Sequence, residues 1–393
     1  MRIAVVGAGI VGAACARALA RAGFEVVVID RGAVAGGTSS CCEGNLLVSD
    51  KPAGPELDLA LLTMTRWPQI ASELHDELGD GFPSIEYEPK GGIVVACTDP
   101  DADALESFVE TQRRQGVEAH TLTPSEALQL EPHLSPRISA AVHYPGDAQL
   151  QPTAAVEALL ASARMAGASV RTGERVTGAL RDDTGSRAVG LRTNRGDLSA
   201  DAVVNAAGPW AGEVAALLGA PVPVLPRYGR VLVTPRMPHR VFHKVYDADY
   251  VSATQSSDTD LQTSTVIEST AAGTVLIGSS RQRVGFDDRL QVRVIAEIAD
   301  KATRLFPFLE YTQVLRTYGG FRPYMPDHLP VIGPDHRVSG LYHVTGHEGA
   351  GIGLSVVSAD ILLAQLTQTV PPTETAPFAL SRASLAPHLR DAA

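Results

Sequence analysis

Basic residues, cysteines and long hydrophobic runs are all scarce in this sequence. Lys and Arg number 33 against 44 Asp and Glu, which leaves a formal net charge of −11. Because binding along nucleic-acid phosphates needs a clustered surplus of Lys and Arg, this composition argues against a nucleic-acid partner. Four cysteines in 393 residues are too few and too unevenly spaced for a disulfide framework or a zinc site. We therefore expect no metal site and a cytoplasmic protein.

The apolar N-terminus could be mistaken for a signal peptide. Gly7, Gly9 and Gly12 interrupt it, however, and no cleavage site of small residues follows. No segment approaches twenty uninterrupted apolar residues, so we expect no transmembrane helix. Peripheral docking to a membrane or to a partner subunit stays open.

Apolar residues, by contrast, make up 45% of the chain. A chain of this length exceeds one ordinary domain and can bury a large core, so two domains are expected. Residues 2–7, 10–22 and 24–30 are typical of a buried strand, an Ala-rich helix and a second buried strand. This βαβ unit predicts an α/β fold class.

The rest of the chain divides into a helical and strand-rich part and a later part with alternating residues. Residues 143–152 are predicted to form a loop, and residues 222–320 alternate apolar and polar residues in a pattern that predicts an antiparallel sheet. The predicted helices are 56–79, 102–115, 124–130, 153–167, 289–305 and 350–367, and the predicted strands before residue 222 lie at 91–96, 169–182, 188–196 and 201–208.

The pattern Gly7-x-Gly9-x-x-Gly12 follows the first strand directly and opens the helix after it. Glycines at this spacing permit a tight turn, a close approach of a pyrophosphate and tight packing of the helix on the strand. Asp30 ends the next strand, 18 residues after Gly12, where a carboxylate can accept hydrogen bonds from ribose hydroxyls. Together these features predict a dinucleotide site, although they do not separate FAD from NAD.

The segment after the acidic strand end separates the two nucleotides better. Gly36-Gly37-Thr38-Ser39-Ser40 supplies the small and hydroxyl residues with which FAD proteins commonly continue. With this segment the sequence resembles the D-amino-acid oxidase superfamily of flavoproteins, which includes glycine oxidase, sarcosine oxidase and several amino-acid dehydrogenases. Four further segments carry the resemblance in the right order along nearly the whole chain, namely residues 205–210, 274–288, 319–333 and 340–353.

The resemblance implies a Rossmann-type FAD-binding domain with an inserted antiparallel-sheet substrate domain of α+β type. The implied bounds are 1–85, 145–221 and 321–393 for the FAD-binding domain, and 86–144 and 222–320 for the substrate domain. Covalent flavin in the sarcosine-oxidase branch uses a Cys near the 319–333 segment, and residues 315–333 contain none, so noncovalent FAD is implied. The residues that the resemblance places against FAD are Gly7, Gly9, Ile10, Val11, Gly12, Asp30, Arg31, Gly37, Thr38, Ser39, Ala207, Gly208, Trp210, Gly346, His347, Glu348, Gly349, Gly351 and Ile352.

Arg322 is the residue that the resemblance assigns to the substrate carboxylate. A guanidinium presents a planar fork that matches a carboxylate with two parallel hydrogen bonds. The alternative is a structural Arg paired with an acid such as Asp327. Tyr250 and His347 are the other catalytic candidates, with core packing for the tyrosine and hydrogen bonding within the loop for the histidine as the alternatives.

The GHEG segment and several further side chains are also candidates for the site. Residues 346–349 read GHEG, so Gly349 stands where glycine oxidase has a second Arg, and this form is more similar to the proline, hydroxyproline and D-amino-acid dehydrogenase branch. Some members of that branch are one subunit of a hetero-oligomer, so the electron acceptor and the homo- or hetero-oligomeric state stay open. Adjacent cysteines close only a strained ring, and we expect Cys41 and Cys42 to be packing residues rather than a redox pair. The remaining candidates for facing the substrate are Tyr246, Asp249, Arg227, Tyr228 and Arg230.

The predicted reaction is hydride transfer from the carbon that bears the amine of a small amino or imino acid to flavin N5, giving an imine or keto acid. The substrate would be a D-amino acid, glycine or sarcosine, or a proline. An NAD(P)-dependent dehydrogenase would use the same glycine loop but would leave residues 346–353 unexplained. A flavin-binding or electron-transfer subunit without turnover is the non-enzyme alternative, against which the retained Arg322 argues.

Overall fold

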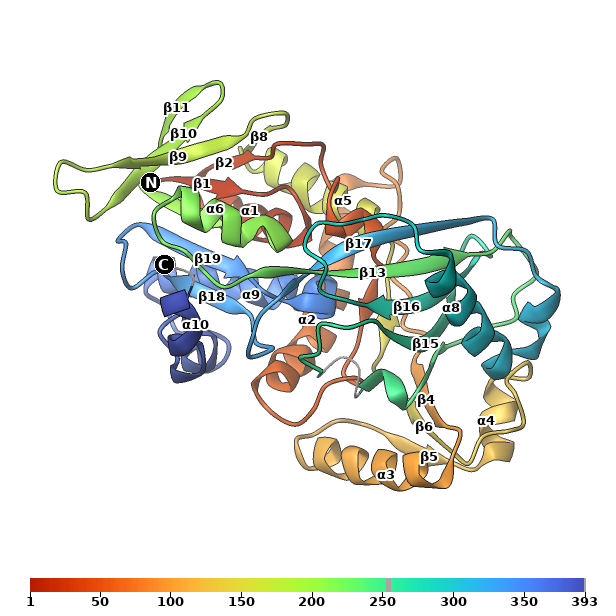
Figure 1. Ribbon diagram of the computed structural model, residues 1–393. Coiled ribbons are helices and arrows are strands. Elements are labelled where there is room, and N and C mark those ends of the chain that lie inside the picture. The colour runs from red at the N-terminus through yellow and green to blue at the C-terminus, as the bar shows by residue number, and fades with distance from the viewer. Residues whose placement is uncertain (252–255, 392–393) are drawn as a thin grey trace.

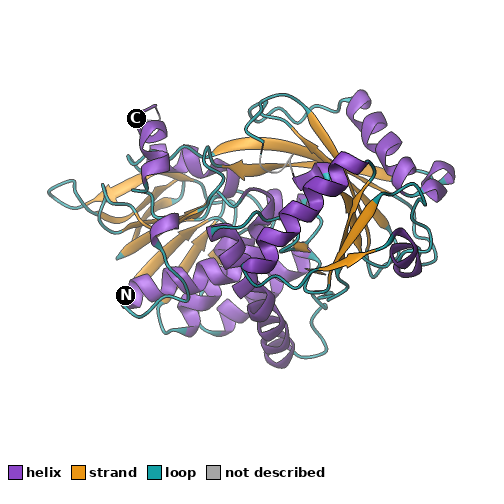
Figure 2. Cartoon of the chain, turned by 90° about the horizontal axis from the view of Figure 1, so that it is seen from below, coloured by secondary structure: helices purple, strands orange, loops and turns teal. Residues whose placement is uncertain are grey.

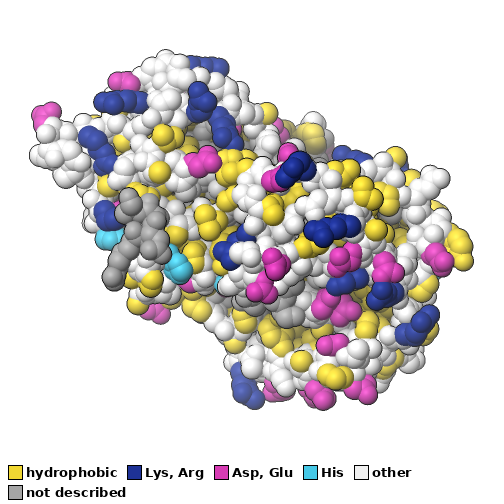
Figure 3. Space-filling view, viewed as in Figure 1, with side chains coloured by type: hydrophobic (Ala, Val, Ile, Leu, Met, Phe, Trp, Pro, Cys, Tyr) yellow, Lys and Arg dark blue, Asp and Glu magenta, His cyan; other side chains and the backbone are white. Residues whose placement is uncertain are grey.

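The structure is a computed structural model that describes residues 1–251 and 256–391. Its strands fall into two main groups, and helices gather between them, as Figure 2 shows from below. On the face seen in Figure 3, acidic and basic side chains are interspersed rather than separated into fields of one sign.

A six-stranded sheet contains the predicted βαβ unit, in the order β18-β19-β12-β1-β2-β8. Its strands are parallel except for the antiparallel pair β18 and β19. Near-continuous Val and Ile runs in β1 and β2 are buried, as expected for a parallel sheet covered on both faces. The strands are β1 (Arg2–Val6), β2 (Glu25–Ile29), β8 (Ser169–Arg171), β12 (Ala202–Asn205), β18 (Val331–Pro334) and β19 (Leu341–Thr345).

An eight-stranded sheet forms the second group, in the order β17-β13-β16-β15-β14-β4-β6-β5. The predicted antiparallel sheet is present, with one parallel pair that was not predicted, β14 with β4. The reason is that β4 comes from a distant part of the chain and enters the sheet as a neighbour, not through a hairpin. The strands are β4 (Gly92–Ala96), β5 (His120–Leu122), β6 (Ala140–Tyr144), β13 (Leu225–Val233), β14 (Lys244–Asp247), β15 (Gln262–Ser269), β16 (Val275–Arg281) and β17 (Arg316–Tyr324).

All the predicted helices are present, with ends shifted by a few residues, and two short helices, α6 and α10, were not predicted. Helices α1, α2, α5 and α9 pack on one another beside the six-stranded sheet, and α8 packs on β15 and β16 of the other sheet. They are α1 (Ile10–Arg21), α2 (Pro55–Leu78), α3 (Asp99–Arg114), α4 (Pro124–Leu130), α5 (Pro152–Met165), α6 (Ala211–Leu217), α8 (Val292–Leu305), α9 (Gly351–Thr367) and α10 (Ala386–Asp391).

Two small sheets complete the fold. Strands β9 (Val176–Arg181), β10 (Ala188–Thr193) and β11 (Gly196–Ser199) form the three-stranded sheet that projects beside β8 in Figure 1. Strand β3 (Asn45–Leu46) pairs with β7 (Ala148–Gln149). The prediction of a loop over 143–152 is therefore wrong in part, because a two-residue strand gives too short a pattern to be seen in the sequence.

The long strands β13 and β17 extend from beside the six-stranded sheet to α8 (Figure 1). They pair along their full length, from Leu225 with Tyr324 to Val233 with Arg316. Strand β17 runs through the predicted domain boundary between residues 320 and 321, and the domain bounds stay a prediction.

The apolar C-terminal region forms helix α9, which is packed in the core. By length and composition alone, the segment Glu348–Thr367 is long and apolar enough to cross a membrane. No such segment was predicted from the sequence, because its apolar residues do not form one uninterrupted run. Within the fold, 61% of its most apolar 18-residue stretch is buried, as in the core helix of a soluble protein. This segment is weak evidence for a membrane span.

Candidate active site

A cavity of about 540 Å³ lies where the parallel strands of the six-stranded sheet end and the eight-stranded sheet begins. The carboxyl ends of β1, β2 and β12 contribute to its walls, as the topology of open α/β sheets favours for a ligand site. Of the predicted site residues, Gly12 and Gly346 lie outside its lining. Those that line it are Gly7, Gly9, Ile10, Val11, Asp30, Arg31, Gly37, Thr38, Ser39, Ala207, Gly208, Trp210, Tyr250, Arg322, His347, Glu348, Gly349, Gly351 and Ile352.

The glycine loop after β1 is shaped by backbone contacts that leave no room for side chains. Gly7 has φ +112°, and a Cβ built there would lie 2.4 Å from the carbonyl oxygen of Ala206. A Cβ at Gly12 would lie 1.9 Å from the carbonyl oxygen of Gly7. Gly12 therefore serves the packing of the loop on α1, while Gly7 and Gly9 border the cavity.

The start of α1 is suited to a pyrophosphate. Its first turn carries no acidic residue, and the N-terminus of a helix presents unpaired N–H groups and a partial positive charge. The carboxylate of Asp30 is fixed by the backbone N–H of Ala8 at 2.8 Å and that of Gly32 at 2.7 Å. A bound dinucleotide would therefore find its phosphate and ribose partners already oriented.

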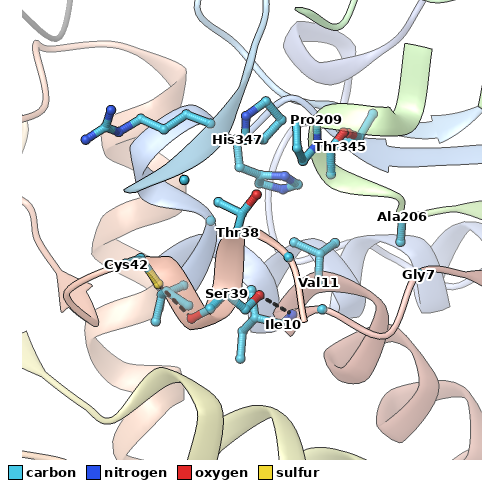
Figure 4. A pocket seen from close by; sticks show the side chains of 18 of the residues that line it. Gly7, Ile10, Val11, Thr38, Ser39, Cys42, Ala206, Pro209, Thr345 and His347 are labelled. Atoms are coloured by element: carbon cyan, nitrogen blue, oxygen red, sulfur yellow. Dashed lines mark hydrogen bonds between the residues drawn. The ribbon is translucent and has the colours of Figure 1, made fainter. Parts of the chain in front are cut away.

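The 3₁₀ helix η1 (Thr38–Cys41) connects the glycine loop to the second sheet. Ser39 Oγ accepts a hydrogen bond from the N–H of Ile10 at 3.0 Å, and Thr38 Oγ1 donates to the carbonyl of Phe321 at 2.6 Å. Figure 4 shows the segments that meet here, with Ile10 and Val11 from α1, Thr38 and Ser39 from η1, and Thr345 and His347 at the end of β19. The predicted hydroxyl segment thus lies against the cavity.

The ring of Trp210 lines the cavity and belongs to a cluster of aromatic side chains. The Arg31 guanidinium lies 4.5 Å from the centroid of the Trp210 ring, and Trp210 stacks on Phe286 with centroids 5.4 Å apart. Phe286 in turn contacts Phe321 edge to face at 5.1 Å. Arg31 and Trp210 therefore belong to one packed stack that spans both sheets.

Arg322 lies on β17 and is partly buried. Its Nη1 donates to the carbonyl of Ser280 at 3.0 Å, and no carboxylate pairs with it among the described residues. Burial, together with the charges of Arg281 and Arg227, lowers the pKa of Arg322 to about 10, so it remains a cation at neutral pH. The alternative pairing with Asp327 is wrong, because Asp327 binds Arg382 through two hydrogen bonds of 2.6 and 2.9 Å.

Tyr250 lines the cavity from a short helical turn that follows β14, not from a strand as expected. The guanidinium of Arg281 lies 4.5 Å from the centroid of its ring. Tyr246 is fully buried and absent from the lining, and Asp249 pairs with Lys301 at 3.1 Å. Within the predicted antiparallel region 222–320, residues 252–255 lie outside the described residues.

His347 and Glu348 occupy the turn between β19 and α9. Burial lowers the pKa of His347 to about 4, so the ring is neutral, and its Nε2 lies 3.0 Å from Ser358 Oγ. Burial alone would raise the pKa of Glu348, but hydrogen bonding to His328 and the charge of Arg227 hold it below its usual value. Glu348 contacts Arg227 at 3.0 Å, and thereby connects this turn to β13.

Arg227, Tyr228 and Arg230 are held by partners inside the fold. Arg227 pairs with Glu348, whereas the Tyr228 hydroxyl bonds to Arg230 and to the carbonyl of Asp288. None of the three appears in the cavity lining. Gly349 does line it, and a Cβ there would lie 3.9 Å from Arg322 Nε, so the glycine leaves the space beside Arg322 open.

Both adjacent cysteines line the cavity. Cys42 Sγ donates to the carbonyl of Ser39 at 3.1 Å, as Figure 4 shows, and burial raises the pKa of this thiol to about 12. A thiol held protonated is a poor nucleophile for redox exchange. Cys41 packs against Gly320 of β17, where a Cβ would lie 2.6 Å from its own Cβ.

The sequence reasoning missed several polar residues that line the cavity. They come from short segments without a regular pattern. The sequence feature that could have identified them is that they lie next to predicted site segments. These residues are Glu43, Asn45, Asp50, Lys51, Glu174, Arg175 and Thr345.

A fold with a dinucleotide cradle at the ends of parallel strands, joined to a sheet that places a cation in the same cavity, is typical of a nucleotide-dependent oxidoreductase. The family described as FAD dependent oxidoreductase, DAO, matches residues 2–366, and the chain belongs to this family. The protein is therefore an FAD-dependent oxidoreductase, and the NAD(P) alternative is set aside.

Individual relatives agree with this assignment. The chain is 31% identical to hydrogen cyanide synthase subunit HcnC of Pseudomonas aeruginosa over 83% of this chain and 74% of that protein. It is 29% identical to the glycine oxidase of Geobacillus kaustophilus over 97% of this chain and 96% of that protein. The crystal structure of a glycine oxidase from Geobacillus kaustophilus superposes with a TM-score of 0.86 at 28% identity, covering 97% of this chain and 99% of that one.

A more distant structure shares the fold alone. The L-proline dehydrogenase from P. horikoshii has a TM-score of 0.82 at 23% identity, covering 94% of this chain and 95% of that one. The cavity fits the FAD of the family, because a glycine cradle, an open helix start and a fixed carboxylate lie at one end and the cation of Arg322 lies in the same cavity.

Proposed function

We propose that the protein oxidises the C–N bond of a small amino or imino acid, of the D-amino acid, glycine or sarcosine, or proline type. The observation that carries the proposal is Arg322, a partly buried guanidinium in the wall of the FAD cavity whose hydrogen-bond partner is one neutral carbonyl. Charges withdrawn from water are normally paired, so this cation is suited to an anion that arrives with the substrate. Support also comes from relatives named glycine oxidase.

Arg322 would hold the substrate carboxylate and so fix the orientation of the Cα–H bond. FAD, when bound, supplies the chemistry by accepting the hydride from that carbon at N5. The chain's own task is to orient the substrate and to exclude water. Tyr250, which lies beside Arg281 in the wall, can donate its hydroxyl to the same carboxylate. His347 would border the cofactor as a neutral ring, since its pKa is about 4.

A second candidate function is a subunit of a hetero-oligomeric dehydrogenase that passes electrons to a partner protein. The relative that shares 31% identity is named a subunit of hydrogen cyanide synthase, which favours this reading. FAD would be bound noncovalently, because residues 315–333 contain no cysteine. The electron acceptor and the cytoplasmic location stay predictions.

Anaerobic bleaching of the FAD absorbance tests the proposal. The FAD-loaded protein is mixed with D-alanine, glycine, sarcosine and L- and D-proline, and with lactate and glycerol 3-phosphate as acids that carry no amine. We expect at least one amino or imino acid to bleach the flavin while the amine-free acids do not. Bleaching by lactate or glycerol 3-phosphate alone would contradict the proposal.

A further inference from the structure

Glu43 is a buried carboxylate in the cavity wall. It follows η1 directly, and its side chain is 9% exposed. Its Oε1 has no hydrogen-bond partner among the described residues, and its Oε2 receives only the amide of Asn45 at 3.3 Å. A buried carboxylate oxygen without a donor is costly unless a ligand or water supplies one.

The position of Glu43 is set relative to Arg322 by strand β16. A Cβ built at Gly278 would lie 2.5 Å from Glu43 Oε1, and Arg322 Nη1 donates to the carbonyl of Ser280. Both side chains therefore contact strand β16 at positions two residues apart in the chain. The negative charge of Glu43 acts on Arg322, and no ion pair joins the two among the described residues.

Glu43 and Arg322 line the same cavity, so an amino acid bound there has room to contact both groups. The carboxyl carbon and the nitrogen of an amino acid lie roughly 2.5 Å apart, as the N–Cα and Cα–C bonds dictate. Hydrogen bonds of about 2.9 Å on either side bring the total to roughly 8 Å. A substrate whose carboxylate is on Arg322 contacts Glu43 with its nitrogen if the two side chains lie within this span.

The neighbouring charges do not neutralise Glu43. Lys244 on β14 and Glu268 on β15 lie opposite each other, next to the paired residues Val245 and Ile267, but Lys244 Nζ and both carboxylate oxygens of Glu268 have no hydrogen-bond partner among the described residues. Burial, together with the charges of Glu43 and other neighbours, raises the pKa of Glu268 to about 7. Lys90 donates to Glu88 at 3.3 Å. Glu43 differs from Glu268 in lining the cavity, where a ligand can reach it.

We propose that Glu43 receives the nitrogen of the substrate while Arg322 holds its carboxylate. The proposal rests on the proposed function. As the Cα–H bond breaks, the hydride leaves with both electrons for the flavin, and the nitrogen lone pair forms the C=N bond. The nitrogen thereby gains a positive charge, and the flavin the matching negative charge. A carboxylate beside the nitrogen stabilises the charge that develops in the transition state, when the neutral amine becomes an iminium ion.

Binding of ligands that cannot react tests the proposal. 2-Aminoisobutyrate has no hydrogen on Cα and cannot be oxidised, and pivalate has the same shape with a methyl group in place of the amine. Both are titrated into FAD-loaded wild type and Glu43→Gln, with the visible FAD spectrum as the readout. In the wild type 2-aminoisobutyrate should bind about tenfold tighter than pivalate or more, as a charge-assisted hydrogen bond predicts.

In Glu43→Gln that preference should fall to about twofold or less, with pivalate binding unchanged. A second variant, Glu43→Asp, keeps the charge and should retain part of the preference, and FAD content shows that both variants are folded. The proposal is overturned if the preference is absent from the wild type, if Glu43→Gln keeps it, or if the variant weakens both ligands equally. The last result would mean that Glu43 has a structural role only.

The proposed function and the role of Glu43 can fail separately. Suppose that no amine bleaches the flavin but the ligand preference disappears in Glu43→Gln. The role of Glu43 in binding the nitrogen is then supported, and the proposed oxidation is not. If amino acids bleach the wild type and Glu43→Gln with equal kcat and KM, the reaction stands and the role of Glu43 does not.

Discussion

The carboxylate of Asp30 accepts a hydrogen bond from the N–H of Ala8 at 2.8 Å, which connects the end of β2 to the glycine loop after β1. Asp30→Ala should therefore raise the Kd for FAD about tenfold or more, because both a ribose acceptor and the support of the loop are lost. Titration of the apoprotein with FAD, followed by flavin fluorescence, measures this. Asp201→Ala is the matched control, since Asp201 accepts from the N–H of Arg2 at the opposite end of β1. Equal effects of the two variants would contradict the assignment.

Gly12 is required by packing rather than by direct contact with the cofactor. In Gly12→Ala the new Cβ would meet the carbonyl oxygen of Gly7 at 1.9 Å, so the loop and α1 must separate. We expect loss of FAD binding and a lower Tm. Gly81→Ala is a suitable control, because a Cβ at Gly81 has nothing within 4 Å. An FAD-loaded Gly12→Ala protein with unchanged Tm would show that the loop can adjust.

Buried His347 should make the protein less stable in acid. Its pKa in the folded protein is about 4, below the ordinary value of about 6.5, so between these pH values the unfolded chain binds a proton that the folded chain does not. Stability is therefore lost as pH falls from about 6.5 to about 4, by about 2 kcal/mol at pH 5. Urea unfolding at pH 5 and pH 7 should show a smaller difference for His347→Gln than for the wild type. The same difference in both proteins would be evidence against a neutral buried ring.

The pair of Asp327 and Arg382 is structural. Both side chains are largely buried, at 11% and 7% exposed, and Asp327→Asn would leave the Arg382 charge with weaker partners. We expect a loss of about 3 kcal/mol in the free energy of unfolding, with KM for the substrate unchanged. Urea unfolding and anaerobic flavin reduction measure the two quantities. A large increase in KM would mean that Asp327 acts on Arg322 after all.

The sequence predicted the βαβ unit well because buried parallel strands and glycine loops leave strong local patterns. Gly7, Asp30 and Ser39 meet at one cavity since each follows a strand end or a predicted site segment. The parallel pairing of β4 with β14 could not be foreseen, because no local pattern marks which distant strand will be a neighbour. Strand β7 was missed because two residues carry no periodicity.

The polar part of the site was harder to predict than the cradle. Arg322 was found through its motif, but Glu43 was passed over because a single acid among small residues has no pattern of its own. Its significance lies in a missing partner, and only the fold reveals which buried groups lack partners. In the same way, the pairing of Asp327 with Arg382 depends on residues 55 positions apart in the chain.

Anaerobic flavin reduction by Arg322→Ala and Arg322→Lys tests the central claim most directly. For the best amino or imino acid, Arg322→Ala should raise KM about 10- to 100-fold, because a buried charge-assisted pair is lost, and Arg322→Lys should recover part of that loss. The corresponding amine without a carboxylate should bleach wild type and variants alike. If Arg322→Ala reduces its flavin as fast as the wild type with the same KM, the carboxylate is held elsewhere and the account is wrong.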